Sequence, residues 1–186
     1  MTREDPVWQL LKDAPLQEHH FRRVWFRLRF SKFMEELAVR LLHQKILADR
    51  ILDNVFSDKI VRVHFAYPDP QSPICRNRNG KIMARGISPD LLVLCDCELP
   101  RNKHCKKAIA YEVKIGVTQI QAPQLNLYMD FIQNPQKFVP KAQEAKVFYF
   151  WITGMDLTSC NIYFTLKEMT VEEVRLRRTL DRMEGK

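Results

Sequence analysis

The sequence predicts an α/β protein in which a mixed central β-sheet is flanked by helices. Three observations lead to this prediction. Apolar residues recur at helical spacing before residue 56, strand-like apolar runs follow between residues 59 and 168, and a helical segment at residues 123–133 interrupts those runs. The predicted order is helices, at least three strands, a helix, two strands and a closing helix.

Length and composition fit one globular domain spanning residues 1–186, of which 46% are hydrophobic. No run approaches the ~20 apolar residues that cross a bilayer. Residues 1–5 lack the basic-then-apolar layout of a secretory signal. The five cysteines are an odd number, which argues against a disulfide framework. We therefore expect an intracellular protein of the cytoplasm or nucleus, with no membrane partner.

The N-terminal part is predicted to be helical from about residue 6 to residue 56. Pro6 occupies a favoured first helical position, and Pro15 interrupts that first helix. Because the span from 17 to 56 is long for one globular helix, we expect a break near Ser31, which would cap a second helix. The apolar stripe of that helix is predicted to be Phe30, Phe33, Met34, Leu37, Ala38 and Leu41.

Strands are predicted from alternation and from enrichment in branched and aromatic residues. The proline-rich stretch from Pro68 to about Gly80 is predicted to be a loop. Gly154 is expected to end a central strand that is buried on both faces. The predicted strands are Lys59–Tyr67, Lys81–Arg85, Asp90–Asp96, Ala108–Lys114, Val147–Thr153 and Asn161–Glu168.

Two further helices complete the predicted layout. Pro123 opens a helix that reaches about Gln133, where Asn134-Pro135 stops it. Residues 170–183 are predicted to form the closing helix, with Thr170 and Glu173 at the spacing of a capping box.

The charge balance favours a polyanionic partner. Thirty basic and 22 acidic residues give a formal net charge of +8, which suits nucleic acid, DNA or RNA. A basic protein without such a partner is the alternative on charge alone. The clustered side chains expected to contact nucleic acid are Arg22, Arg23, Arg27, Arg76, Arg78 and Lys81.

A charged pair stands out within the predicted strand Ala108–Lys114. Side chains alternate along a strand, so Glu112 and Lys114 share one face while Tyr111 and Val113 share the other. Burying an isolated charge is costly, so a sheet interior tolerates this pair only if it is neutralised or holds a metal ion.

Pro89-Asp90 and Glu112-Val113-Lys114, at the start of one strand and the end of the next, resemble the motif of the PD-(D/E)XK nuclease superfamily. The resemblance covers most of the chain in element order, whereas its motif covers five residues. Gly86 and the helical segment from Gln124 to Tyr128 are similar to the exonuclease branch. The resemblance implies a restriction-endonuclease-like αβββαβ core and a metal-dependent nuclease. DNA is the favoured substrate. RNA is the alternative, and a viral cap-snatching type of endonuclease is included in it.

The resemblance also implies roles for individual residues. Asp90 and Glu112 would supply carboxylates to Mg²⁺ or Mn²⁺, which prefer hard oxygen ligands, and the Val113 main-chain carbonyl would join them. The cation would neutralise the phosphodiester and acidify a bound water. Lys114 would sit beside that water.

Gln124 and Tyr128 lie four positions apart, on one face of the predicted helix. The resemblance implies that they touch the metal-bound water or the scissile phosphate. The alternatives are that Tyr128 belongs to the core and that Gln124 is a solvated helix starter. Gln119 and Gln121 compete for the same role.

Members of the superfamily often add an acid from the first core helix, and some add a histidine. Glu35 and Glu36 are the acidic candidates, on opposite flanks of the predicted apolar stripe. His43 is the best placed histidine, and the alternatives are His19, His20, His64 and His104. Each of Glu35, Glu36 and His43 is a metal ligand or simply a helix side chain, and the sequence leaves that choice open.

Two other readings compete with the predicted site. Cys95, Cys97, His104 and Cys105 gather near one hairpin loop and would make a four-ligand zinc site, although their spacing matches no common zinc module. Asp69 forms a second Pro-Asp pair but lacks a matching Glu-x-Lys. At the level of function, the alternative is a catalytically inactive nucleic-acid-binding or assembly module on the same fold. A homodimer or a larger nucleoprotein complex is compatible with either function.

Overall fold

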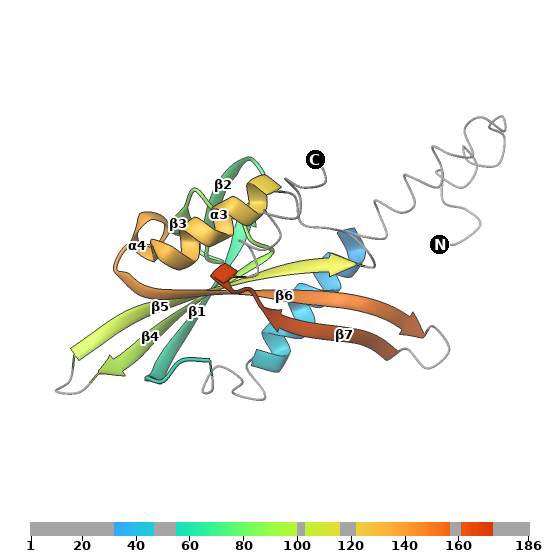
Figure 1. The fold of residues 1–186 in the computed structure, drawn as a ribbon, viewed down its shortest axis with the longest axis horizontal. Coiled ribbons are helices and arrows are strands. Elements are labelled where there is room, and N and C mark those ends of the chain that lie inside the picture. Colours follow the sequence, from blue (N-terminus) through green and yellow to red (C-terminus); the bar gives the residue numbers. More distant parts are fainter. Residues whose placement is uncertain (1–31, 47–54, 100–102, 116–121, 157–160, 173–186) are drawn as a thin grey trace.

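A computed structural model describes residues 32–46, 55–99, 103–115, 122–156 and 161–172. These residues form a β-sheet with helices packed on both of its faces (Figure 1). The mixed α/β class predicted from the sequence is therefore confirmed. Within these ranges, no helix is both long enough and apolar enough to cross a membrane.

The described residues contain a seven-stranded sheet in the spatial order β3-β2-β1-β4-β5-β6-β7. Neighbouring strands are antiparallel, except that β5 and β6 are parallel, so the sheet is mixed as predicted. The strands are β1 Lys59–Asp69, β2 Ser72–Arg76, β3 Ile82–Arg85, β4 Leu91–Leu99, β5 Lys103–Ile115, β6 Ala142–Asp156 and β7 Asn161–Glu168.

The described helices are residues 32–46, α3 Ala122–Gln133 and the short α4 Pro135–Phe138, and residues 171–172 are also helical. β1, β4 and β5 form an antiparallel meander, and the β2–β3 hairpin is inserted between β1 and β4. Parallel strands need a crossover connection, and α3 lies in the one between β5 and β6.

Alternation along β5 separates two apolar cores, one on each face of the sheet. Ala108 and Ala110 pack with Leu125 and Tyr128 of α3. The intervening residues face the opposite core, which contains the helix of residues 32–46: Ile109, Tyr111 and Val113. The predicted division of the faces of β5 is confirmed, because successive side chains of a strand point to opposite sides.

The helix of residues 32–46 buries a stripe that differs from the predicted one. Met34, Ala38, Leu42 and Ile46 are buried at four-residue intervals, whereas Phe33 is 60% exposed. Apolar residues occupy so much of the circumference that periodicity alone does not fix the centre of the stripe. The observed rotation decides which flanking side chains meet the sheet.

The proline-rich stretch contains a strand where a loop is predicted. Residues Ser72–Arg76 form β2 and pair with both β1 and β3. Pro73 lacks an N–H donor, but it lies near the register shift at Pro68/Asp69, where the hydrogen-bond ladder is already interrupted. Proline content therefore misleads here.

Other predicted boundaries also need correction. β6 continues through Gly154 to Asp156, because the glycine coincides with a register shift between Ile152 and Gly154 instead of ending the strand. Pro135 follows α3 but begins α4, where its missing N–H costs nothing. Residues 55–56 lie in a turn, so the N-terminal helix does not reach Phe56. The predicted helices within residues 6–31, the break at Ser31 and the closing helix beyond residue 172 lie outside the described residues.

A buried lysine near the start of β5 pairs with two acids, one just before β1 and one in β6. Lys107 Nζ lies 2.6 Å from both Asp58 Oδ2 and Glu144 Oε2, and its side chain is only 5% exposed. It also lies 4.8 Å from the centre of the Phe56 ring. Two carboxylates therefore compensate one desolvated ammonium group, which a buried charge requires.

We expect Lys107→Ala to lower the free energy of unfolding by about 2 kcal/mol, because charged hydrogen bonds of this kind are worth roughly 1.5–3 kcal/mol. Urea denaturation followed by circular dichroism would measure the change. Lys59→Ala is the matched control, since the Lys59–Glu98 pair is 3.5 Å long and its lysine is 79% exposed, and we expect it to cost less than about 0.5 kcal/mol. Equal losses in the two variants would contradict the role assigned to Lys107.

Candidate functional site

The register of β4 and β5 brings two carboxylates together. Leu91 pairs with Tyr111 in the antiparallel ladder, which sets Asp90, one residue earlier, beside Glu112, one residue later. The Asp90 carboxylate accepts a hydrogen bond of 2.6 Å from the Val113 main-chain N–H. Upstream, Gly86 adopts a φ of 78°, a backbone conformation that favours glycine, in the turn from β3 to Asp90.

Glu112 is surrounded by hydrogen-bond donors. Lys114 Nζ lies 2.6 Å and Gln124 Nε2 2.5 Å from Glu112 Oε1. The Tyr128 hydroxyl donates to Glu112 Oε2. Glu112 is only 5% exposed, and these donors satisfy a carboxylate that water scarcely reaches.

Helix α3 supplies two of those donors from one face. Gln124 and Tyr128 are one helical turn apart, so both side chains reach the same carboxylate. Tyr128 is 1% exposed, which agrees with its alternative placement in the core. Burial, with the nearby Glu112 charge, raises the Tyr128 pKa well above its ordinary value, so the hydroxyl stays protonated as a donor. The competing Gln119 and Gln121 lie outside the described residues.

The helix of residues 32–46 brings a third acid to the site. Burial raises the pKa of Glu35, while the Lys114 charge lowers it and the Glu112 charge raises it. These interactions place Glu35 within electrostatic reach of the β5 pair. Glu36 is exposed and lines the adjoining cleft. Of the two acids left open by the sequence, the structure couples Glu35 to Glu112 and Lys114.

Crowded carboxylates change the protonation of Asp90. Burial, followed by repulsion from Glu112, raises the Asp90 pKa from 3.8 to about 7, while the Val113 N–H partly opposes the rise. A nearby cation would relieve this repulsion, and oxygen ligands of this type suit Mg²⁺ or Mn²⁺. The donor chemistry of Asp90, Glu112 and Glu35 therefore fits a divalent ion.

The side-chain arrangement is not that of an assembled coordination shell. Among the described residues, no group of three or more His, Cys, Asp or Glu side chains is arranged to hold a metal ion. Both oxygens of Glu112 are engaged by donors. Val113 contacts Asp90 through its N–H, and the part implied for its carbonyl stays a prediction.

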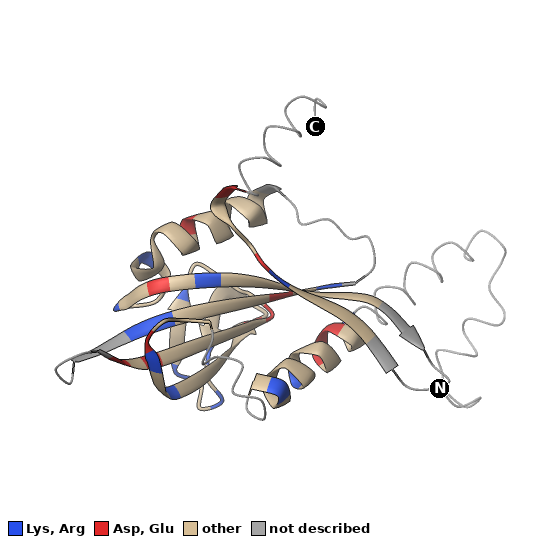
Figure 2. Cartoon of the chain, turned by 60° about the horizontal axis from the view of Figure 1, so that its bottom comes forward, with Lys and Arg blue, Asp and Glu red and all other residues tan. Residues whose placement is uncertain are grey.

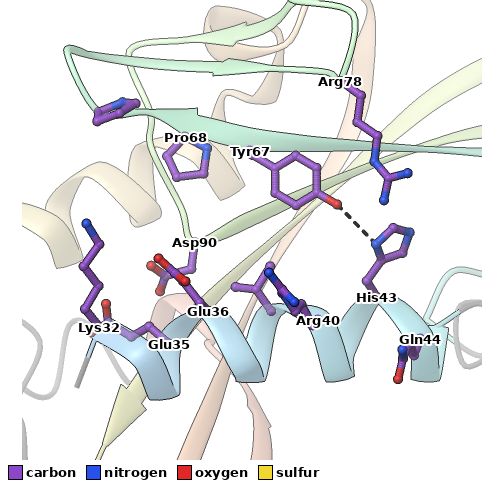
Figure 3. A pocket seen from close by; sticks show the side chains of 12 residues that line it. Lys32, Glu35, Glu36, Arg40, His43, Gln44, Tyr67, Pro68, Arg78 and Asp90 are labelled. Carbon is purple, nitrogen blue, oxygen red and sulfur yellow. Dashed lines mark hydrogen bonds between the residues drawn. The ribbon is translucent and has the colours of Figure 1, made fainter. Parts of the chain in front are cut away.

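A cleft of about 910 Å³ opens beside Asp90. The helix of residues 32–46 forms one wall, and opposite it lie Tyr67 of β1 and Arg78 of the turn between β2 and β3 (Figure 3). His43 lies at the far end from Asp90, where its Nδ1 is 3.2 Å from the Tyr67 hydroxyl. The structure therefore does not bring His43 together with Asp90 and Glu112.

The predicted basic contacts have different surroundings. Arg78 lines the cleft, whereas Arg76 is held by Asp69 Oδ2 and the Gly80 carbonyl, each at 3.0 Å. Lys81 is exposed on the same turn. Asp69 thus has a structural role as the partner of Arg76, which agrees with its exclusion from the predicted site. The remaining predicted contacts lie outside the described residues: Arg22, Arg23 and Arg27.

The cysteines of the alternative zinc site are core residues where they are described. Cys95 and Cys97 are fully buried among the apolar side chains beneath the helix of residues 32–46. Burial raises the Cys95 thiol pKa to about 12, which disfavours the thiolate that zinc requires. The side chains of His104 and Cys105 lie outside the described residues.

Sequence reasoning missed several cleft residues. Tyr67 and Pro68 belong to the end of β1, and Lys32 and Arg40 to the helix. Arg40 is four positions from Glu36, so the helical period signals a shared flank. Tyr67 carries no comparable signal, because its place in the cleft depends on how the sheet packs against the helix.

We expect the metal-free protein to become more stable at about pH 8 when Asp90 is replaced by Asn. A carboxyl whose pKa is raised by folding, here from 3.8 to about 7, contributes stability below its unfolded pKa and loses it as the pH rises through its folded pKa. Thermal melts in EDTA should therefore show a gain for Asp90→Asn at about pH 8 that shrinks towards pH 4.

Asp130→Asn is the matched control, because the Lys137 hydrogen bond lowers the Asp130 pKa and reverses the sign. It should give no gain at high pH. An Asp90→Asn variant whose stability relative to wild type does not depend on pH would contradict the electrostatics described for Asp90.

No protein-family model matches the chain, and no curated protein or solved structure matches it. What the site does is therefore inferred from the chemistry of its residues.

Proposed function

We propose that this protein is a divalent-metal-dependent nuclease that hydrolyses phosphodiester bonds in nucleic acid. The observation that carries the proposal is the convergence of Asp90, Glu112 and Lys114 beside an open cleft. Two clustered carboxylates with an adjacent ammonium group suit a hydrolytic site that handles an anionic substrate. DNA is the favoured substrate, and RNA is the second.

The architecture supports the proposal. The succession of a helix, the β1–β4–β5 meander, α3 and the parallel strand β6 is similar to the αβββαβ core of PD-(D/E)XK nucleases. In this assignment, the β2–β3 hairpin is an insertion and β7 an addition at the edge. Fold alone does not decide function, so the proposal depends on the site.

The residues of the site would have different roles in the reaction. Asp90 and Glu112 would hold Mg²⁺ or Mn²⁺, with Glu35 as a further acid. When bound, the ion would supply charge neutralisation and acidification of water. Lys114 would orient the attacking water or stabilise the charge that develops on the phosphate. Gln124 and Tyr128 are positioning residues, since both donate hydrogen bonds to the Glu112 carboxylate.

Labelled single- and double-stranded DNA and RNA, incubated with Mg²⁺, Mn²⁺ or EDTA, would test the proposal. We expect cleavage that requires the metal and that falls by at least about 100-fold in Lys114→Ala, the scale of losing one group that stabilises transition-state charge. Lys106→Ala is the matched control. It removes a lysine from the same face of β5, eight residues away, which is roughly 27 Å along a strand.

The Lys106→Ala variant should cleave at nearly the wild-type rate. Binding of nucleic acid without cleavage, with every metal and every substrate, would reject the enzyme and leave an inactive binding or assembly module on the same fold.

A further inference from the structure

The cleft beside Asp90 continues into a second hollow. This smaller hollow, of about 260 Å³, is lined by His64, Asn77 and Asn79 among others, and it shares His43 and Arg78 with the larger cleft. Residues 77–79 form the tip between β2 and β3. The inserted hairpin and the helix of residues 32–46 therefore border a groove that leads away from the carboxylates.

The groove changes its charge along its length. Three acids, Asp90, Glu35 and Glu36, lie with one lysine, Lys32, at one end, whereas Arg40 and Arg78 lie farther along (Figure 3). Figure 2 shows both acidic and basic positions along the helix itself, and their order is Lys32, Glu35, Glu36, Arg40 and Lys45. Within the described part of the chain, neither Arg40 nor Arg78 forms an ion pair with a carboxylate, so both guanidinium groups are available to an anionic ligand.

His43 is held in place beside Arg78. Its ring centre lies 4.0 Å from that of Phe65, and its Nδ1 lies 3.2 Å from the Tyr67 hydroxyl. Burial and the Arg78 charge lower the His43 pKa, which favours the neutral ring near pH 7. In the tautomer whose Nδ1 accepts from Tyr67, Nε2 carries the proton and is a hydrogen-bond donor.

We propose that Arg78 and His43 bind a backbone phosphate of the nucleic-acid strand, distinct from the scissile phosphate near Asp90. A guanidinium group pairs with phosphate through two parallel N–H donors, and a neutral imidazole adds a third. The proposal rests on the proposed nuclease function and adds a second contact point on its substrate. Arg78 is thereby distinguished from Arg76, whose guanidinium is engaged by Asp69 and Gly80.

The distance between the two ends of the groove limits the number of nucleotides that lie between the scissile phosphate and the second phosphate. Glu36 and His43 are seven positions apart on one helix, which corresponds to ~10.5 Å at ~1.5 Å per residue. A helical strand advances ~3.4 Å per nucleotide along its axis, and successive phosphates are farther apart than this rise because the strand winds around the axis. The second phosphate therefore lies at most about three nucleotides from the scissile one, and substrates that end before it on that side lose the contact.

Oligonucleotides shortened one nucleotide at a time from each side of a mapped cut site would test this separation. In the wild type, kcat/KM should fall about 10-fold at one removal within the first three phosphates on one side of the cut. Arg78→Ala should lower kcat/KM about 10-fold on the long substrate, mainly through KM, and should then be insensitive to that removal. Arg85→Ala is the matched control, since Arg85 is an exposed arginine of the same hairpin and lines neither hollow.

The Arg85→Ala variant should keep the wild-type length dependence. An Arg78→Ala variant with the wild-type length dependence would overturn the proposal. If the wild type cleaves nothing, fluorescence anisotropy in EDTA with twelve-nucleotide single-stranded DNA and RNA decides separately. Weaker binding by Arg78→Ala than by Arg85→Ala then supports the phosphate site although the nuclease function fails, and equal binding rejects both.

Discussion

The rest of the site depends on one constraint, the close approach of the Asp90 and Glu112 carboxylates where β4 begins and β5 ends. Burial, and after it the repulsion from the Glu112 charge, raises the Asp90 pKa. Hydrogen-bond donors offset this repulsion. The Val113 N–H donates to Asp90, and Glu112 accepts from Lys114, Gln124 and Tyr128. Each donor lies on β5 or on the helix packed against the same face, so the fold and the electrostatics of the site are inseparable.

The two faces of the sheet make different contributions. Helix α3, on one face, buries Tyr128 and fixes the orientation of Glu112. The helix of residues 32–46, on the other face, brings Glu35 within electrostatic reach of Glu112 and forms a wall of the cleft. The inserted β2–β3 hairpin adds Arg78 opposite that helix. An insertion in the meander thus supplies a feature of the cleft that the core elements alone lack.

Much of this arrangement could be predicted from local sequence, because strand alternation fixes the faces of β5 and the helical period fixes Gln124 and Tyr128 together. Three features could not. β2 lies in a proline-rich stretch, and the strands on either side of it, β1 and β3, determine its pairing. The choice between Glu35 and Glu36 depends on a helix rotation that exposes Phe33. The sequence offers His43 as a candidate metal ligand, but packing of β1 against the helix sets it beside Tyr67 and Arg78 instead.

Mn²⁺ binding, followed by titration calorimetry without nucleic acid, tests the central claim most directly, namely that the paired carboxylates hold a divalent ion. We expect the wild type to bind Mn²⁺ and Glu112→Gln to bind it more than about 100-fold more weakly, beyond the 10–100-fold typical of residues that only support metal ligands. Glu36→Gln, which removes an exposed acid of the same cleft, should change the affinity little. Equal affinities in the wild type and Glu112→Gln would contradict the account.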